Sequence, residues 1–146
     1  MGAFADREGY KKKFFSVFFF TGLLFTLLLT LISEGDWIWC IGLFVIARVG
    51  WAGSILFYDS FLVDVTEPKR MDRVSTYGYG WGYIGSVIPF LIVVALVFLG
   101  RDPGQESIPE LHTKAGFVVV ALWWMAFSLP LLKNVEQNYF VEEKAS

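Results

Sequence analysis

Four long apolar runs constrain the fold of this chain more than any other feature of its sequence. They cover residues 14–32, 37–58, 81–99 and 115–132, and each is about 18–22 residues long. At 1.5 Å per residue, a helix of that length crosses the roughly 30 Å hydrocarbon layer of a bilayer. Because every backbone polar group in lipid needs a partner within its own segment, the runs are predicted to be helices.

The predicted fold class is therefore an all-α integral membrane protein with four transmembrane helices. Charged residues make up 18% of the chain, against roughly 25% in soluble domains. The first run is longer than the 7–15 apolar residues of a secretory signal and no small-x-small cleavage site follows it, so it is interpreted as a retained helix. We expect a cytoplasmic loop at 1–13, the membrane region at 14–132 and a cytoplasmic tail at 133–146.

Basic residues outside the runs predict the orientation. Two of them, Arg101 and Lys114, lie between the third and fourth runs. The other nine lie on the opposite side, which holds both termini and the segment between the second and third runs: Arg7, Lys11, Lys12, Lys13, Lys69, Arg70, Arg73, Lys133 and Lys144. We therefore expect both termini in the cytoplasm and lipid around the helices. The net charge of −2 gives no reason to expect a nucleic-acid partner.

Small residues form stripes on the second and third runs. The stripe on the third run contains Gly78, Gly82, Gly85, Ser86 and Pro89, and the stripe on the second contains Ala47, Gly50 and Ser54, with Gly53 beside them. Such faces let helix backbones approach closely, and a proline inside a helix offers a bend. We expect close contact between the second and third runs, either as static packing or as a pair that slides or rocks.

Arg48 is the one charged residue within the four runs, about eleven residues from either end of its own run. A charge near the bilayer centre costs about 2.5–3.5 kcal/mol, so it is expected to face a bundle interior or a wet cavity. The other three runs contain no Asp, Glu or His. Two interpretations stay open. Arg48 is satisfied by backbone carbonyls and water, or it contacts an anionic ligand group or a residue outside this chain, which is the interpretation we favour.

No catalytic or metal-binding pattern occurs in the sequence. His112 is the one histidine, and no second His or Cys is placed as a co-ligand, so no metal site is expected. No Ser-His-Asp set, phosphate-binding glycine loop or nucleophile elbow is present. The acidic residues lie outside the apolar runs, and we interpret them as solvated charges. We expect neither an enzyme nor a bound cofactor.

Two segments resemble a known family. The amino-terminal sequence GAFADREGYKK resembles the GxxxDxxGxKK signature of the major facilitator superfamily, with matches at Gly2, Asp6, Gly9 and Lys11 and with Tyr10 where a basic residue is common. The segment FYDSFLVDVTEPKRMDRVSTYGYGWGYIGS is similar to the fourth-to-fifth helix region of the vacuolar-effluxer-like branch of that superfamily. Together they cover most of residues 2–89, and the order of the helices extends the resemblance to the end of the chain.

The resemblance implies helices three to six of a twelve-helix secondary transporter, within its amino-terminal six-helix bundle. Two such bundles rock about a central site, and the loop with Gly2, Asp6, Gly9, Lys11 and Lys12 belongs to the inner gate. Bacterial members of this branch are permeases, so a bacterial plasma membrane is expected. Members with described roles export amino acids from vacuoles, which makes amino acids the candidate substrate class.

Two departures from the superfamily pattern leave the coupling ion and the direction of transport open. Arg48 is followed by Gly50 and Gly53 instead of the customary glutamine-glycine spacing, and Pro89 does not directly follow a glycine. The principal hypothesis is part of a secondary transporter whose partners are a small solute and the remaining helices. The alternative is a four-helix membrane subunit or scaffold that assembles with other chains through its glycine faces.

Overall fold

The computed structural model describes residues 10–101, 104, 109–136 and 138. Within this part of the chain there are four long helices: α2 (Tyr10–Leu28), α3 (Trp37–Ser60), α5 (Met71–Leu99) and α6 (Glu110–Asn134). The shorter elements are η1 (Leu29–Leu31), α4 (Leu62–Val65) and η2 (Pro68–Arg70). The long helices begin up to ten residues before the apolar runs, because polar residues continue the helix beyond the membrane-length stretch.

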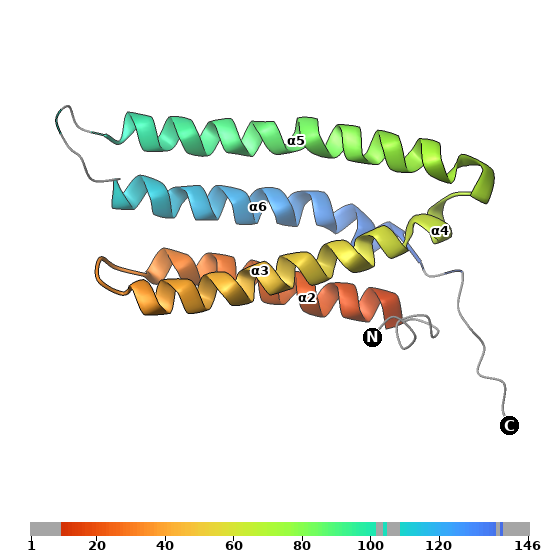
Figure 1. The fold of residues 1–146 in the computed structure, drawn as a ribbon, viewed down its shortest axis with the longest axis horizontal. Helices are drawn as coiled ribbons and strands as arrows, with labels where there is room; N and C mark the ends of the chain where they lie inside the picture. Colours follow the sequence, from red (N-terminus) through yellow and green to blue (C-terminus); the bar gives the residue numbers. More distant parts are fainter. Residues whose placement is uncertain (1–9, 102–103, 105–108, 137, 139–146) are drawn as a thin grey trace, which may run out of the picture.

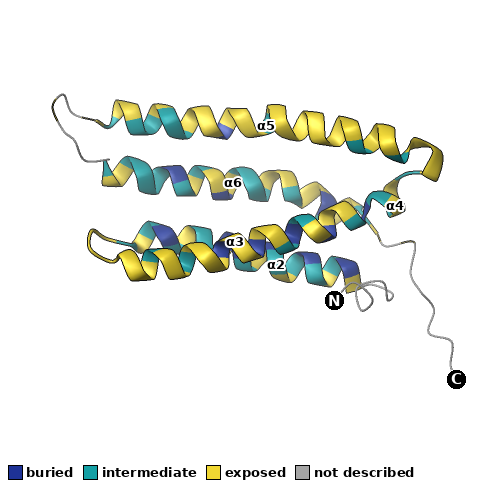
Figure 2. Cartoon of the chain, in the orientation of Figure 1, coloured by how far each residue is buried: buried dark blue, intermediate teal, exposed yellow. Residues whose placement is uncertain are grey.

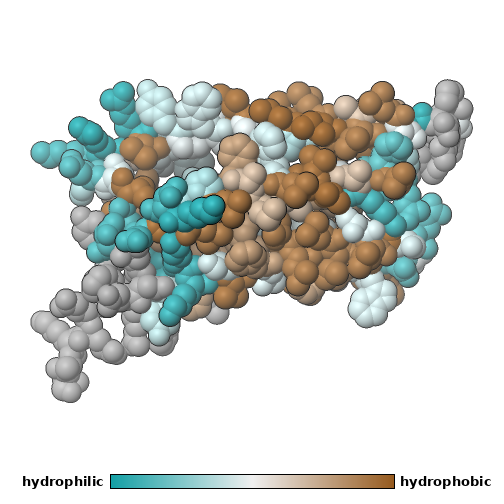
Figure 3. All heavy atoms as spheres, turned by 180° about the vertical axis from the view of Figure 1, so that it is seen from behind, coloured by the Kyte–Doolittle hydropathy of each residue, from teal (hydrophilic) through white to brown (hydrophobic). Residues whose placement is uncertain are grey.

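All four long helices are long and apolar enough to cross a membrane. On the face that Figure 3 shows, the surface is mainly apolar along the middle of the molecule, and hydrophilic residues gather toward the two ends. That distribution suits a bilayer, because the hydrocarbon layer excludes charged groups and the headgroup layers accept them. The prediction of an all-α membrane chain with four transmembrane helices is confirmed.

The helices form two antiparallel hairpins that lie side by side (Figure 1). In the first hairpin α2 packs along α3, and in the second α5 packs along α6. Helix α6 also contacts α2 and so joins the hairpins, while α5 lies outermost (Figure 1). Gly35 turns the chain between α2 and α3 at φ 95°, a backbone conformation that glycine adopts without a Cβ clash.

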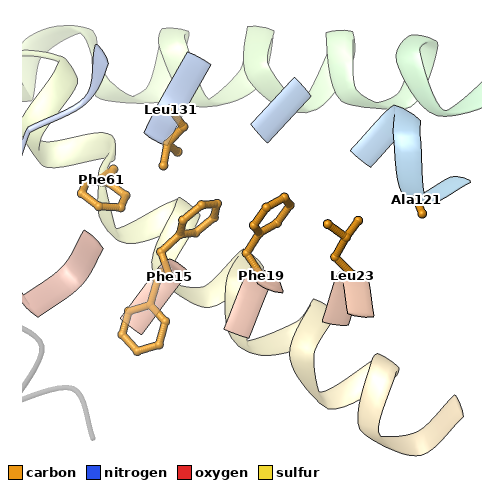
Figure 4. Close-up of a cluster of buried hydrophobic side chains, with 7 residues drawn as sticks. Phe15, Phe19, Leu23, Phe61, Ala121 and Leu131 are labelled. Atoms are coloured by element: carbon orange, nitrogen blue, oxygen red, sulfur yellow. The ribbon is translucent and has the colours of Figure 1, made fainter. Parts of the chain in front are cut away.

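The apolar core lies between α2, the end of α3 and α6 (Figure 4). Its buried side chains are Phe15, Phe19, Leu23, Phe57, Phe61, Ala121 and Leu131. Phe15 meets Phe61 edge to face at 6.5 Å between ring centroids, and Phe19 meets Trp124 in the same way at 5.2 Å. Edge-to-face pairs of this kind add to the packing that holds helices together in lipid, where no hydrophobic force distinguishes a neighbour from a lipid tail.

The small-residue stripe of α3 packs against α2. Ala47, Gly50 and Ser54 are buried, and a Cβ on Gly50 would strike the backbone of Gly22. A Cβ on Gly53 would strike the ring of Phe18. The prediction that this stripe contacts the third run was therefore wrong, because the stripe contacts α2 instead. The short loop between α2 and α3 makes them a hairpin. On α2, Gly22 has no side chain and so lets the two helix backbones approach.

Helix α5 presents its glycines to open space. A Cβ added at Gly78, Gly82 or Gly85 would meet no atom within 4 Å, outside its own local backbone. Most residues of α5 are exposed (Figure 2), and Pro89 is its one buried residue. The helix continues through Pro89 from Met71 to Leu99. Pro89 shares the helix face of Gly78, Gly82 and Gly85, so within the described residues this face is covered at Pro89 and left open at its three glycines and at the exposed Ser86.

Candidate functional site

Three segments meet at one end of the helices, which we call the elbow end. They are the start of α2, the end of α6 and the elbow, residues 61–70, which connects α3 to α5 (Figure 1). Helix α4 turns within the elbow because the amides of Asp64 and Val65 both donate to the carbonyl of Phe61. Phe61 is itself buried in the core. This anchor positions Asp64 close to the first turn of α2.

Lys11 and Asp64 form a buried ion pair at this end. The Lys11 ammonium lies 3.2 Å from the Asp64 carboxylate, and the two side chains are 5% and 0% exposed. The pair joins positions 53 residues apart in the sequence. Two buried charges must satisfy each other, because each loses the water that would otherwise solvate it. The interpretation of the acidic residues as solvated charges was wrong for Asp64.

The segment after α6 completes this polar cluster. The Asn138 amide donates to the Asp64 carboxylate at 2.8 Å, and the Asn138 side chain donates to the Asp64 carbonyl at 3.3 Å. The Lys12 ammonium donates to the carbonyl of Val135 at 3.0 Å. The elbow cluster, defined as Lys11, Lys12, Asp64, Val135 and Asn138, therefore ties three segments that are distant in sequence. It can hold the elbow end of the bundle as one unit.

Of the five residues that the family signature assigns to the inner gate, two belong to the elbow cluster. Lys11 and Lys12 point to different partners, one to the elbow and one to the segment after α6. Gly2, Asp6 and Gly9 lie outside the described residues. The sequence offered no direct sign of Asp64 or Asn138. The one available signal was an acidic residue six positions after the end of an apolar run, in a chain with a lysine run before its first apolar run.

Arg48 lies on the outer side of α3. It is two residues before Gly50, about 200° around the helix, and so faces away from α2. Its side chain is exposed within the described part of the chain, and its guanidinium lies over the Trp51 ring at 4.0 Å from the centroid. The expectation that Arg48 faces a bundle interior or a wet cavity stays a prediction, because the described residues leave its side of α3 uncovered. The guanidinium and the indole form a cation–π pair at the middle of an uncovered helix face.

A second polar contact crosses the elbow on its exposed side. The Tyr79 hydroxyl donates to the Asp59 carboxylate at 3.2 Å, which links the last turn of α3 to α5. No group of three or more His, Cys, Asp or Glu residues that could hold a metal ion was found among the described residues. The charged groups that the fold brings together thus make structural contacts between segments, with Arg48 set apart from them.

The chain matches a protein family along most of its length. The model of the family described as "Vacuole effluxer Atg22 like" matches residues 1–67 and 63–141. A protein of Bacillus subtilis (strain 168), named as an uncharacterized MFS-type transporter, YxiO, is 40% identical over 147 residues, which is 99% of this chain and 34% of the relative. No solved structure matches.

Two fungal proteins match part of the chain. Autophagy-related protein 22-1 of Penicillium rubens is 33% identical over 64 residues, and the protein of the same name from Aspergillus fumigatus is 34% identical over 64 residues. Each match covers 44% of this chain and 10% of the fungal protein. The chain therefore spans about a third of the length of the bacterial relative, and its matched part spans a tenth of each fungal one.

Proposed function

Because this chain belongs to the vacuole effluxer Atg22-like family of membrane transporters, we propose that it forms part of a secondary active transporter that moves a small solute by alternating access. The observation that carries this proposal is the 40% identity to an MFS-type transporter across 99% of the chain. Four membrane-length helices agree with it. The family is one of transporters, and we assign no catalytic role to any residue.

The proposed position of the chain is helices three to six of the amino-terminal bundle. In this arrangement further helices of the transporter cover two surfaces that the four helices leave open. One is the glycine face of α5, with Gly78, Gly82 and Gly85, where an added Cβ would meet nothing within 4 Å. The other is the face of α3 that carries Arg48. In lipid, such glycine faces let two helix backbones approach closely.

The elbow end is proposed to face the cytoplasm of a plasma membrane. The excess of basic residues at this end supports the orientation. The elbow cluster then belongs to the inner gate, where it keeps α2, the elbow and the end of α6 together while this bundle moves against its partner. A buried pair such as Lys11–Asp64 suits that role. Separating its two residues would leave a buried charge without its partner, which is energetically costly.

Arg48 is proposed to contact the solute. Its guanidinium can bind a carboxylate through two parallel hydrogen bonds, which is why amino acids are the solute class that we propose to test first. Within the apolar run 37–58, the face of α3 that carries it is apolar apart from this charge. A single strong cation at mid-membrane depth must be solvated by water, by a ligand or by another helix. A substrate pathway provides the first two.

The test is solute flux into proteoliposomes that hold the chain together with the further helices of its longer relatives. Replacing Arg48 with Gln should lower the flux of a carboxylate-bearing solute at least tenfold, and Arg48→Lys should retain part of it, because a lysine keeps the charge and loses the bidentate geometry. Arg101→Gln, a charge removed outside the membrane helices, is the control. Unchanged flux in Arg48→Gln would remove the site role.

One observation supports a second candidate function. The open glycine face of α5 can equally receive a helix of another protein, as in a four-helix subunit or scaffold. Cross-linking through a cysteine placed at Gly82 distinguishes the transporter from the subunit or scaffold. A transporter predicts cross-links to helices of the same transporter, whereas a scaffold predicts cross-links to a different membrane protein and normal flux when the face is blocked.

A further inference from the structure

A basic hollow lies where α5 leaves the elbow. It has a volume of about 500 Å³ and is lined by Arg70, Arg73, Val74 and Tyr77. These residues recur at i, i+3, i+4 and i+7, so they share one face of the helix. The Arg73 guanidinium lies over the Tyr77 ring at 5.6 Å from its centroid. The hollow thus combines two cations with an aromatic and an aliphatic wall.

The acidic groups nearby have other partners or positions. Asp64 pairs with Lys11 and Asp59 accepts from Tyr79, while Asp72 lies about 200° around the helix from Arg70. Glu67 and Lys69 offset each other in charge. Among the described residues the ion pairs are Lys11–Asp64 and Lys114–Glu110, and neither includes an arginine of the hollow. Within the described part of the chain, the two guanidinium groups therefore remain open to a bound anion.

The depth of the hollow is that of the lipid headgroups. Counting back from Leu99, the end of α5, about 28 Å of helix reaches Trp81, which is close to the thickness of the hydrocarbon layer. Tyr77 lies about 6 Å beyond Trp81 and Arg73 about 12 Å beyond it. Tyrosine is enriched at this boundary, and basic side chains there attract anionic headgroups.

We propose that this hollow binds the phosphodiester headgroup of an anionic phospholipid such as phosphatidylglycerol. Arg70 and Arg73 contact the phosphate oxygens, for which the planar guanidinium is well suited. Val74 and Tyr77 pack against the glycerol backbone and the first carbons of the acyl chains. A soluble phosphate would use the arginines and gain nothing from the apolar wall, so the composition of the hollow favours lipid.

The experiment measures lipid retention by the purified chain in neutral detergent, using native mass spectrometry during titration with phosphatidylglycerol or phosphatidylcholine. We expect one phosphatidylglycerol to be retained in preference to phosphatidylcholine. The double variant Arg70→Gln/Arg73→Gln should weaken its retention about tenfold or more, since each basic side chain contributes a few-fold near an anionic lipid. Both arginines are exposed, so the variant should keep its helical circular dichroism.

The matched control is Lys13→Gln/Lys133→Gln, which removes the same charge from exposed positions at the same end of the helices. It should retain phosphatidylglycerol within about twofold of the unchanged chain. A lipid held by contacts within the hollow does not depend on distant charges, whereas attraction by the overall positive charge of this end would. Equal loss in both double variants, or no loss in Arg70→Gln/Arg73→Gln, would overturn the proposal. So would displacement of the lipid by millimolar inorganic phosphate, which would assign the hollow to a soluble anion.

Discussion

At the scale of single residues, the ion pair between Lys11 and Asp64 is the contact on which the elbow end depends. Lys11 comes from the first turn of a membrane helix and Asp64 from a four-residue helix in the elbow. Both side chains are covered, and Asn138 adds a third segment to the same carboxylate. One apolar anchor, Phe61, and one ion pair therefore fix the path of the elbow.

Replacing Lys11 with Met should destabilise the chain by about 3–5 kcal/mol, because it leaves the Asp64 carboxylate buried without its cation. The double variant Lys11→Met/Asp64→Leu should recover part of that loss. The measurement is the free energy of unfolding in mixed micelles. The control is Lys114→Met, which breaks an exposed i,i+4 pair with Glu110 and should cost less than about 0.5 kcal/mol. Equal effects of Lys11→Met and Lys114→Met would contradict a buried pair.

Which charged residues are buried could be predicted only in part from the sequence. Arg48 is the one charge inside an apolar run, but the sequence could not show that its face of α3 would be uncovered within the described residues. Asp64 was missed because its burial depends on the fold of the elbow and on Asn138, 74 residues further along the chain. A charge outside an apolar run is normally solvated, and local composition does not reveal this exception.

At the scale of helices, glycine has two different uses in this chain. On α3, Gly50 allows backbone contact with Gly22 of α2, and Gly53 makes room for the Phe18 ring. On α5 the glycines meet no neighbour within the described residues. The sequence predicted both stripes and the helices that carry them. It could not predict the pairing, because a stripe of small residues specifies close approach without specifying a partner.

Gly50→Ala should destabilise the α2–α3 hairpin by about 1–3 kcal/mol, because the added methyl group would overlap the backbone of Gly22 and the helices would have to separate. Gly82→Ala is the matched control on α5, where nothing lies within 4 Å. It should be neutral or stabilising by up to about 1 kcal/mol through helix propensity. Thermal unfolding followed by circular dichroism measures both. A larger loss in Gly82→Ala than in Gly50→Ala would contradict the observed packing.

At the scale of the whole molecule, the two hairpins leave much apolar surface uncovered. Helix α5 contacts α6 on one side, and most of its other residues are exposed. Lipid can cover apolar surface, but it does not explain a glycine face or an arginine at mid-membrane depth. These two surfaces are where further helices of a transporter are proposed to pack, and the length of the bacterial relative agrees with that arrangement.

The proposed orientation predicts that the elbow is accessible from the cytoplasm. In a Cys40→Ser background, Glu67→Cys should react with a membrane-impermeant thiol reagent in inside-out vesicles and stay unreactive in right-side-out ones. Ser33→Cys, in the short loop between α2 and α3, should show the opposite pattern and serves as the control. Labelling of Glu67→Cys from the outside alone would reverse the proposed orientation.

The most direct test of the central claim is solute flux in proteoliposomes, across a panel of amino acids, sugars and organic anions. The chain together with the further helices of its longer relatives should show saturable uptake of at least one solute. The chain by itself should show none, because four helices on one side of a pathway cannot enclose it. Absence of flux from the complete assembly across the whole panel, or equal flux from the chain alone, would contradict the claim that this chain is part of an alternating-access transporter.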